Sequence, residues 1–187
     1  MKTTPMKQYL KNILQLILSP TKGWEDISAA VENPDTVAAK GYYPLLAVAA
    51  LSTFARLFYD HHLSVVTVVM LAVALFGTYF ISFYVGRIAL ESLLKNVVTG
   101  EPNVTKITLF ILYTLGLSVI IEIIENCVPT SLTPIKFLPL FVALIIYRGS
   151  AYMAVKPDNE LRFLVICVAV LLVMPILIML LLNNLIN

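Results

Sequence analysis

The fold is decided by residues 63–90, which read LSVVTVVMLAVALFGTYFISFYVGRIAL. No charged side chain interrupts this stretch before Arg87. A helix of about 20 residues crosses the hydrocarbon core of a bilayer. Because backbone groups in lipid must be hydrogen-bonded within their own segment, the stretch predicts a transmembrane α-helix. It is longer than a perpendicular crossing needs, so we expect it to tilt or to project beyond the lipid.

The whole chain has the composition of a membrane protein. Of its 187 residues, 59% are hydrophobic and 13% are charged, and the mean hydropathy is +0.89. Ordinary soluble domains have about 25% charged residues. We therefore predict an all-α polytopic membrane protein, a bundle of about five transmembrane helices with a short N-terminal amphipathic helix. The expected spans are Tyr42 to Phe58, Leu63 to Leu90, Val104 to Ile124, Ile135 to Val155 and Phe163 to Ile186.

Residues 1–40 are expected to form a small cap of interfacial helices ahead of the transmembrane domain, residues 41–187. Within this cap, Met6 to Leu18 places apolar side chains at helical spacing on one side and lysines and amides on the other. Two interpretations remain open. The helix lies flat in the membrane interface with its lysines toward anionic head groups, or it packs against neighbouring helices. Trp24, the single tryptophan, is predicted to be an interfacial anchor.

The distribution of basic residues predicts the orientation of the chain. Eleven of the 13 Lys and Arg residues fall on the N-terminal side of the expected spans, and Arg56 and Lys136 fall on the other side. Basic loops are retained in the cytoplasm. We therefore expect a cytoplasmic N-terminus and an Asn183 to Asn187 tail that lies outside or in a lumen.

Small side chains form a stripe along the second expected span. Ala74, Thr78, Ser82 and Gly86 are four residues apart and share one helix face. Such a stripe lets another helix approach closely, which is how membrane helices gain packing energy. A substrate path along the same groove is the alternative interpretation.

Three ionisable side chains are expected toward the cytoplasmic ends of the spans. Arg87 and Glu91 share a helix face, and Arg148 lies a couple of turns inside the end of the fourth span. Charges at that depth normally face the bundle and find partners. We expect Arg148 to pair with Glu91 as a structural ion pair, with Arg87 as a second candidate partner for the carboxylate. A proton relay is the alternative.

Polar residues are expected to gather at the opposite rim. Two carboxylates and two imidazoles can in principle hold zinc. Adjacent histidines project in different directions, however, and no His-Glu-x-x-His motif is present, so polar capping of the interface is favoured over a metal site. The residues of this outer cluster are Arg56, Asp60, His61, His62, Glu122, Glu125 and Cys127.

Several classes of function find no support in the sequence. The net charge of +2 comes from dispersed lysines and not from a basic stripe, so nucleic acid is not an expected partner. Cys127 and Cys167 are expected near opposite surfaces, too far apart for a disulfide. The sequence has no Gly-x-Ser-x-Gly elbow, phosphate loop or dinucleotide fingerprint. We expect no enzyme activity and no cofactor.

Two stretches resemble a known family. Ile17 to Ile27, which reads ILSPTKGWEDI, and Tyr147 to Pro157, which reads YRGSAYMAVKP, are similar to bacterial members of the Yip family of Ypt/Rab-interacting membrane proteins. The resemblance covers most of the chain and implies five spans and a cytoplasmic N-terminus. In eukaryotes this family acts in vesicle traffic by binding Rab GTPases and one another. For this chain the resemblance implies a bacterial inner-membrane protein.

The sequence therefore favours a non-enzymatic membrane scaffold or adaptor, whose cytoplasmic helices and exposed helix faces bind lipid, other membrane proteins or a second copy. The alternative is a small transporter or channel built around the cluster of Arg87, Glu91 and Arg148. A transporter needs a water-accessible polar cavity near the bilayer midplane. The expected midplane stretches, residues 69–75 and 171–178, are almost entirely apolar, which favours the scaffold.

Overall fold

The computed structural model describes residues 4–129 and 137–186, and the regular secondary structure of these residues is helical. This confirms the all-α fold expected for a polytopic membrane protein. Four helices of the described residues are long and apolar enough to cross a membrane. They are Pro34–Phe58, Val65–Leu93, Val104–Cys127 and Pro157–Leu182.

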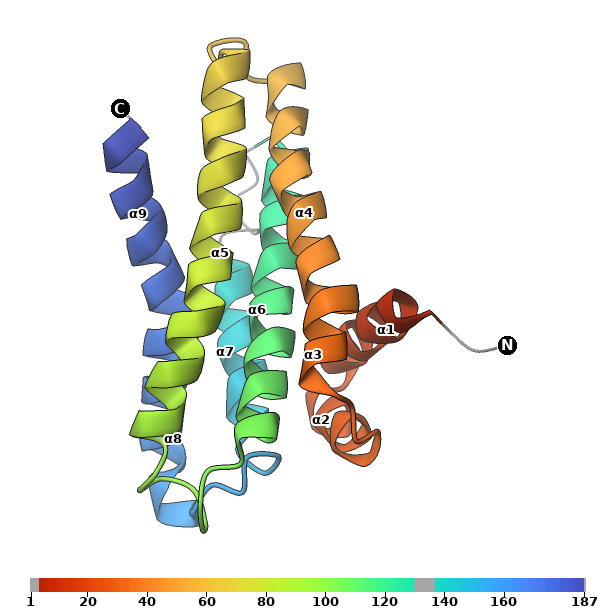
Figure 1. Ribbon diagram of the computed structural model, residues 1–187, viewed down its shortest axis with the longest axis vertical. Helices are drawn as coiled ribbons and strands as arrows, with labels where there is room; N and C mark the ends of the chain where they lie inside the picture. The colour runs from red at the N-terminus through yellow and green to blue at the C-terminus, as the bar shows by residue number, and fades with distance from the viewer. Residues whose placement is uncertain (1–3, 130–136, 187) are drawn as a thin grey trace.

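Figure 1 labels the first and last of these helices in segments, because tighter and wider turns interrupt them. The first comprises α3 (Pro34–Val37), the π-helical turn η1 (Ala38–Tyr42), α4 (Tyr43–Ser52) and the 3₁₀ turn η2 (Thr53–Phe58). The second and third are α5 (Val65–Leu93) and α6 (Val104–Cys127). The last comprises η4 (Pro157–Asn159), α8 (Glu160–Val168), the π-helical turn η5 (Ala169–Val173) and α9 (Met174–Ile186).

The first span begins earlier than expected, at Pro34 and not at Tyr42. The side chain of Asn33 accepts hydrogen bonds from the backbone N–H groups of Asp35 and Thr36, which satisfies donors that a helix start leaves free. The helix then continues through η1 into α4. Residue 40, the expected limit of the N-terminal cap, therefore lies inside a continuous helix.

The helix found in the region of the expected fourth span is shorter than that span. This helix is α7 (Leu138–Arg148), which has 11 residues. At about 1.5 Å per residue, α7 is roughly 16 Å long, about half the thickness of a hydrocarbon core. The residues after Arg148 form turns, and Val155 makes a β-bridge with Val98. The start of the expected span, Ile135, lies outside the described residues.

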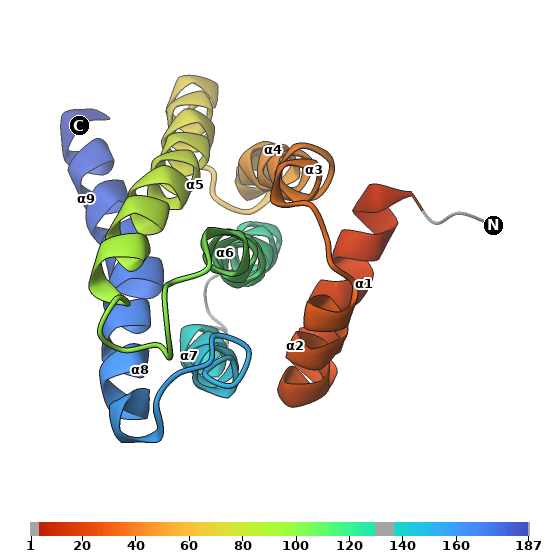
Figure 2. The same cartoon turned by 60° about the horizontal axis from the view of Figure 1, so that its bottom comes forward.

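α6 is the central helix of the bundle. Figure 2 shows α4, α5, α7 and the long helix of α8 and α9 arranged around it. Every residue of α6 from Ile107 to Val119 is buried. The outer helices instead expose apolar side chains, such as Val73 at 67% and Leu181 at 64%. Lipid is the solvent that such an apolar exterior requires.

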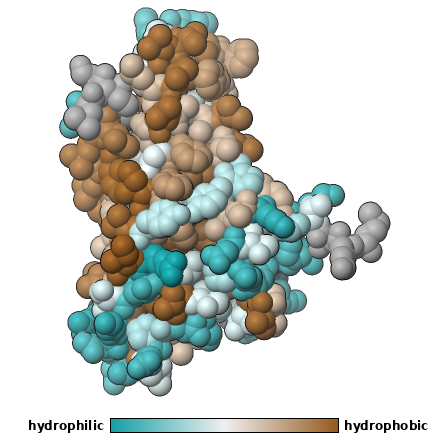
Figure 3. Space-filling model, viewed as in Figure 1, coloured by the Kyte–Doolittle hydropathy of each residue, from teal (hydrophilic) through white to brown (hydrophobic). Residues whose placement is uncertain are grey.

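The two ends of the bundle differ in polarity. One end, which we call the basic end, carries Lys95 and Lys156. There the loop of residues 94–103 pairs with the turn of residues 149–156. The N–H of Thr99 donates to the carbonyl of Ala154 (2.8 Å), and that of Lys156 donates to the carbonyl of Val97 (3.1 Å). The far end is the turn of residues 59–64, which joins η2 to α5. Figure 3 shows hydrophobic residues over the upper part of the molecule and hydrophilic residues gathered toward the basic end and around the N-terminal helices.

Candidate functional site

The N-terminal cap, residues 5–32, is the part of the structure that stands outside the bundle. It contains α1 (Pro5–Leu18) and α2 (Pro20–Ala29), each with a proline in its first turn, where the missing N–H costs nothing. Figure 1 shows α1 projecting sideways from the bundle while α2 lies beside the basic end. The two helices pack on each other, and the cap contacts both α6 and α7.

Tyr9 fixes α1 to the central helix. Its side chain is 2% exposed, its hydroxyl donates to the carbonyl of Leu112 (2.7 Å), and its ring centroid lies 5.1 Å from that of Tyr113. Gly116 makes this contact possible, because a Cβ built there would clash with the Tyr9 hydroxyl. Burial raises the pKa of the Tyr9 phenol well above its usual value, so the group stays protonated and remains a donor.

A polar network joins the cap to α6 at a second point. The Asn12 amide nitrogen donates to the hydroxyl of Tyr113 (2.8 Å) and to Oε1 of Glu32 (3.1 Å). The Tyr113 hydroxyl in turn donates to Oε2 of Glu32. Three segments that are far apart in sequence therefore share one hydrogen-bonded cluster. Such a network orients the cap as well as holding it, because each hydrogen bond requires a particular geometry.

Trp24 fixes α2 to the bundle, which corrects its expected role as an interfacial anchor. The side chain is 2% exposed, and its Nε1 donates to the carbonyl of Ile145 (3.0 Å). The indole stacks between Phe110 and Tyr152, with centroid distances of 5.0 and 5.2 Å. The protein supplies both an apolar enclosure and a hydrogen-bond acceptor, so the indole does not need the interface.

The outward surface of α1 has two distinct faces. Residues rotate by about 100° each along a helix, so Leu10, Leu14 and Ile17 lie on a flank turned about 100° from Tyr9. That flank is exposed. The lysines Lys7 and Lys11 lie beyond it and are exposed as well. α1 therefore packs against the bundle with one face and still presents an apolar flank beside basic side chains, so the two interpretations drawn from its sequence are compatible in one structure.

α2 exposes a polar surface. Lys22, Glu25 and Asp26 are all exposed, on the side opposite the buried Trp24 and Ile27. This surface belongs to a helix held in place by the Trp24 stack, and it carries charges of both signs.

The three charges expected near the basic end do not come together. Within α5, a carboxylate oxygen of Glu91 accepts a hydrogen bond from Nε of Arg87 at 3.0 Å. Arg87 was the second candidate partner for this carboxylate. Arg148 is exposed and lies over the ring of Tyr147, 6.0 Å from its centroid. The expected pair of Arg148 and Glu91 is wrong: Glu91 pairs with Arg87 of its own helix, and the neighbours of α7 are α6, α8 and α2.

The stripe of small residues lies where α5 meets the last span. Ala74, Thr78, Ser82 and Gly86 are all buried. A Cβ at Gly86 would lie 3.5 Å from Leu171 Cδ2, and the Thr78 hydroxyl donates to Met179 Sδ at 3.5 Å. The stripe therefore serves close approach between helices, as its spacing suggested.

The outer cluster separates into two groups. Asp60, His61 and His62 belong to the far-end turn, where Oδ1 of Asp60 accepts from the N–H of His62 (3.2 Å). Glu122 and Glu125 lie on α6, below that turn. No group of three or more possible metal ligands occurs among the described residues. Lys136, the other basic residue expected on this side, lies outside them.

The contacts that hold the cap were not found from the sequence. No sequence motif marks Tyr9, Asn12 or Glu32. The α6 partners of Tyr9 and Asn12 are 103 and 101 positions away in the sequence. The available signal is a glycine, Gly116, that leaves room for an aromatic ring. This signal becomes specific only when α1 is known to lie on α6.

Comparisons with known proteins give no further assignment: no family model matches the chain, and neither the curated proteins nor the solved structures contain a significant match.

Proposed function

We propose that the protein is a non-enzymatic scaffold or adaptor of a bacterial inner membrane, with its N-terminal cap on the cytoplasmic surface. The observation that carries the proposal is the cap itself. Buried contacts at Tyr9 and Trp24 hold it to the bundle, and it still exposes an apolar flank and a polar helix. A structure that only needed to cross the membrane would not require these fixed external helices.

Two further points support this proposal. The residues of α6 from Ile107 to Val119 are all buried, and the cluster of Arg87, Glu91 and Arg148 on which a transporter was considered is not formed as a unit. The resemblance of residues 17–27 and 147–157 to the Yip family favours a role in binding other proteins at a membrane surface. Partners are then expected on α2, with lipid head groups beside α1.

The proposed orientation predicts which residues an impermeant reagent reaches in intact cells. Lys7→Cys is placed in a chain whose exposed Cys127 is changed to Ser, while the buried Cys167 is retained. We expect an impermeant maleimide to modify Lys7→Cys only after the cells are permeabilised. The matched variant His61→Cys, at the far end, is expected to react in intact cells. Modification of Lys7→Cys in intact cells contradicts the orientation.

The adaptor role predicts protein contacts on the cap. A photoreactive benzoylphenylalanine is introduced singly at Lys22 and Asp26 on α2, at Leu14 on the apolar flank, and at the exposed His61 as the control. After irradiation in native membranes, we expect discrete protein adducts from the α2 positions. Leu14 is expected to give mainly lipid adducts, and His61 is expected to give no protein adducts.

Mass spectrometry of the adducts identifies the partner class. The role is refuted if Lys22 and Asp26 yield only lipid adducts or unmodified chain, as they would if the cap served the fold alone. Adducts between two copies of the chain at these positions assign the surface to self-association, a form of scaffold that the proposal includes.

A further inference from the structure

A cavity of about 250 Å³ lies in the far half of the bundle, bordered by α5, α6, the start of α7 and the last span, and it opens to the outer surface of the bundle at Ile176 and Leu180. Small-molecule sites typically have roughly 300 to 1,000 Å³, so its size suits a small ligand or one end of a longer one. Most of its walls are apolar, and they include Leu75, Ile121, Leu171 and Leu172. The cavity is distinct from the N-terminal cap, so a ligand bound in it is independent of the scaffold role proposed for the cap.

Irregular turns in the last span lie beside the cavity. η5 is a π-helical turn, and Pro175, the second residue of α9, has no N–H to bond the preceding turn. A wider turn next to a proline displaces one part of a helix relative to the other. Pro175 lines the cavity, as does Pro139 in the first turn of the short helix α7.

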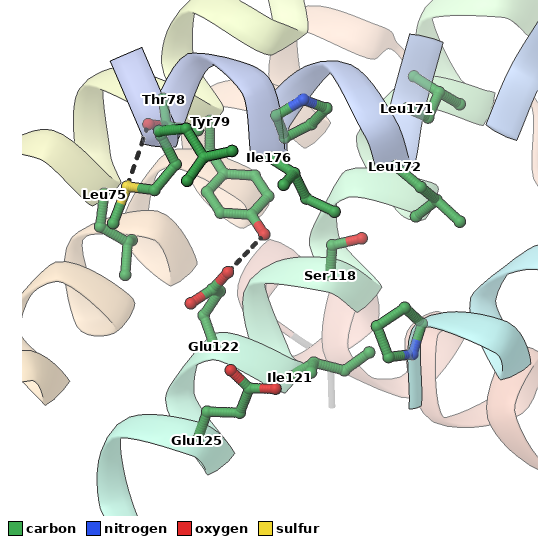
Figure 4. A pocket seen from close by; sticks show the side chains of 14 residues that line it. Leu75, Thr78, Tyr79, Ser118, Ile121, Glu122, Glu125, Leu171, Leu172 and Ile176 are labelled. Carbon is green, nitrogen blue, oxygen red and sulfur yellow. Dashed lines mark hydrogen bonds between the residues drawn. The ribbon is translucent and has the colours of Figure 1, made fainter. Parts of the chain in front are cut away.

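One wall of the cavity carries carboxylates. Glu122 and Glu125 are one turn apart on α6, and both line the space. Figure 4 shows the Glu122 carboxylate directed at Tyr79, whose hydroxyl donates to Oε1 at 3.0 Å. Among the described residues, this is the hydrogen bond that the Glu122 side chain receives. None of the described residues that line the cavity is basic, although Arg56 in η2 lies close enough to attract the charge of Glu122 from outside the lining.

The carboxylate is held in a fixed position. Tyr79 is 6% exposed, and its own backbone carbonyl accepts from the hydroxyl of Tyr42 (3.0 Å). Tyr42 lies in the π-helical turn of the first span. Three spans therefore fix one oxygen of Glu122, while the side chain as a whole is only half-buried and borders the cavity.

Two buried hydroxyl groups, those of Ser118 and Thr78, also line the cavity. Ser118 is 9% exposed and lines the cavity, and its hydroxyl makes only a long contact of 3.5 Å to the carbonyl of Thr114. Thr78 is 1% exposed, and its hydroxyl contacts a sulfur atom at 3.5 Å. The Ser118 contact is at the limit of hydrogen bonding, so Ser118 retains acceptor capacity on the cavity side, whereas the Thr78 hydroxyl donates to a sulfur atom at an ordinary distance.

We propose that this cavity binds an amphiphilic amine, a molecule with an apolar body and one ammonium group. Two carboxylates one turn apart repel each other in a low dielectric, and a cation placed between them removes that repulsion. The apolar walls take the adjoining hydrocarbon. A longer chain continues past Ile176 and Leu180, which line the cavity and are exposed on the surface of α9.

The test compares three probes of the same chain length: dodecylamine, dodecanol and dodecanoate. Each is titrated into the full chain in nanodiscs of phosphatidylcholine, and binding is measured by native mass spectrometry. Because a charge-assisted hydrogen bond is stronger than a neutral one, we expect dodecylamine to bind about tenfold or more tightly than dodecanol. Dodecanoate is expected to bind more weakly than either.

Two variants locate the site. Glu122→Gln keeps the shape of the side chain and should weaken dodecylamine binding about tenfold while leaving dodecanol unchanged. Ser118→Leu fills the cavity without altering either carboxylate and should weaken both probes. It also keeps the test decisive if Glu122→Gln does not fold. The control is Glu91→Gln, which removes a carboxylate paired with Arg87 outside the cavity and should change nothing.

The proposal is overturned if the three probes bind equally, which indicates partition into the surrounding lipid. It is also overturned if Ser118→Leu leaves dodecylamine binding intact. A preference for dodecanoate places the cationic partner on the protein and excludes an amine as the ligand.

Discussion

Replacement of Gly116 by alanine is expected to release α1 from the bundle. The new Cβ would clash with the Tyr9 hydroxyl, so the ring must move and its hydrogen bond to Leu112 must break. Overpacking costs about 1 to 3 kcal/mol, and a buried hydrogen-bonding group left unpaired costs about the same again. A total of about 3 kcal/mol corresponds to a roughly hundredfold increase in the undocked population. Amide hydrogen exchange of residues 5–18 measures it directly.

Gly77→Ala is the matched control for this prediction. It is the same substitution in another membrane helix, but there the nearest atom to the added Cβ is Leu182 Cδ1 at 4.0 Å. We expect no change in the exchange of α1, and alanine is intrinsically the better helix former. Equal protection of α1 in the Gly116→Ala and Gly77→Ala variants would show that the Tyr9 contact does not hold the cap.

Trp24→Ala is expected to cause the second large effect. The substitution removes the stack between Phe110 and Tyr152 and one of the two hydrogen bonds that the carbonyl of Ile145 accepts, the other coming from the N–H of Gly149. Truncation of a buried aromatic side chain costs about 3 to 5 kcal/mol. Unfolding in mixed detergent micelles, followed by circular dichroism, measures the loss.

Two further variants separate the contributions of the indole. Trp24→Phe keeps an aromatic ring but loses the N–H, so we expect a loss of about 1 to 2 kcal/mol. Leu18→Ala, at a side chain that is 73% exposed, should have little effect on stability. If Trp24→Ala is no more harmful than Leu18→Ala, Trp24 contributes to membrane contact and not to the fold.

The long apolar stretches predicted most of the fold because hydropathy alone identifies a membrane helix. Boundaries were less accurate where local interactions decide them. The segment from Pro34 to Gly41 includes Asp35 and Lys40 and was expected to precede the first span, yet the Asn33 cap starts a continuous helix there. The stretch around α7 is apolar enough for a span, and hydropathy does not reveal that its helix ends at Arg148.

The polar contacts were harder to predict than the helices. Whether Glu91 pairs with Arg87 or Arg148 depends on which spans are neighbours, and the sequence does not order the spans around α6. Trp24 was assigned to the interface from its residue type, since its acceptor, the carbonyl of Ile145, is 121 positions away. The small-residue stripe was easier, because its four-residue spacing is a property of one helix.

The short helix α7 gives the protein a lopsided hydrophobic belt. On one side the bilayer meets α5, whose 29 residues amount to roughly 43 Å, and on the other it meets the exposed side chains of α7, on a helix of 11 residues. Lipids next to a short hydrophobic wall thin the bilayer, and those next to a long one thicken it or tilt the helix. Each ångström of mismatch costs a fraction of a kcal/mol, so a membrane of uneven thickness favours one rotation of the molecule about the bilayer normal over the others.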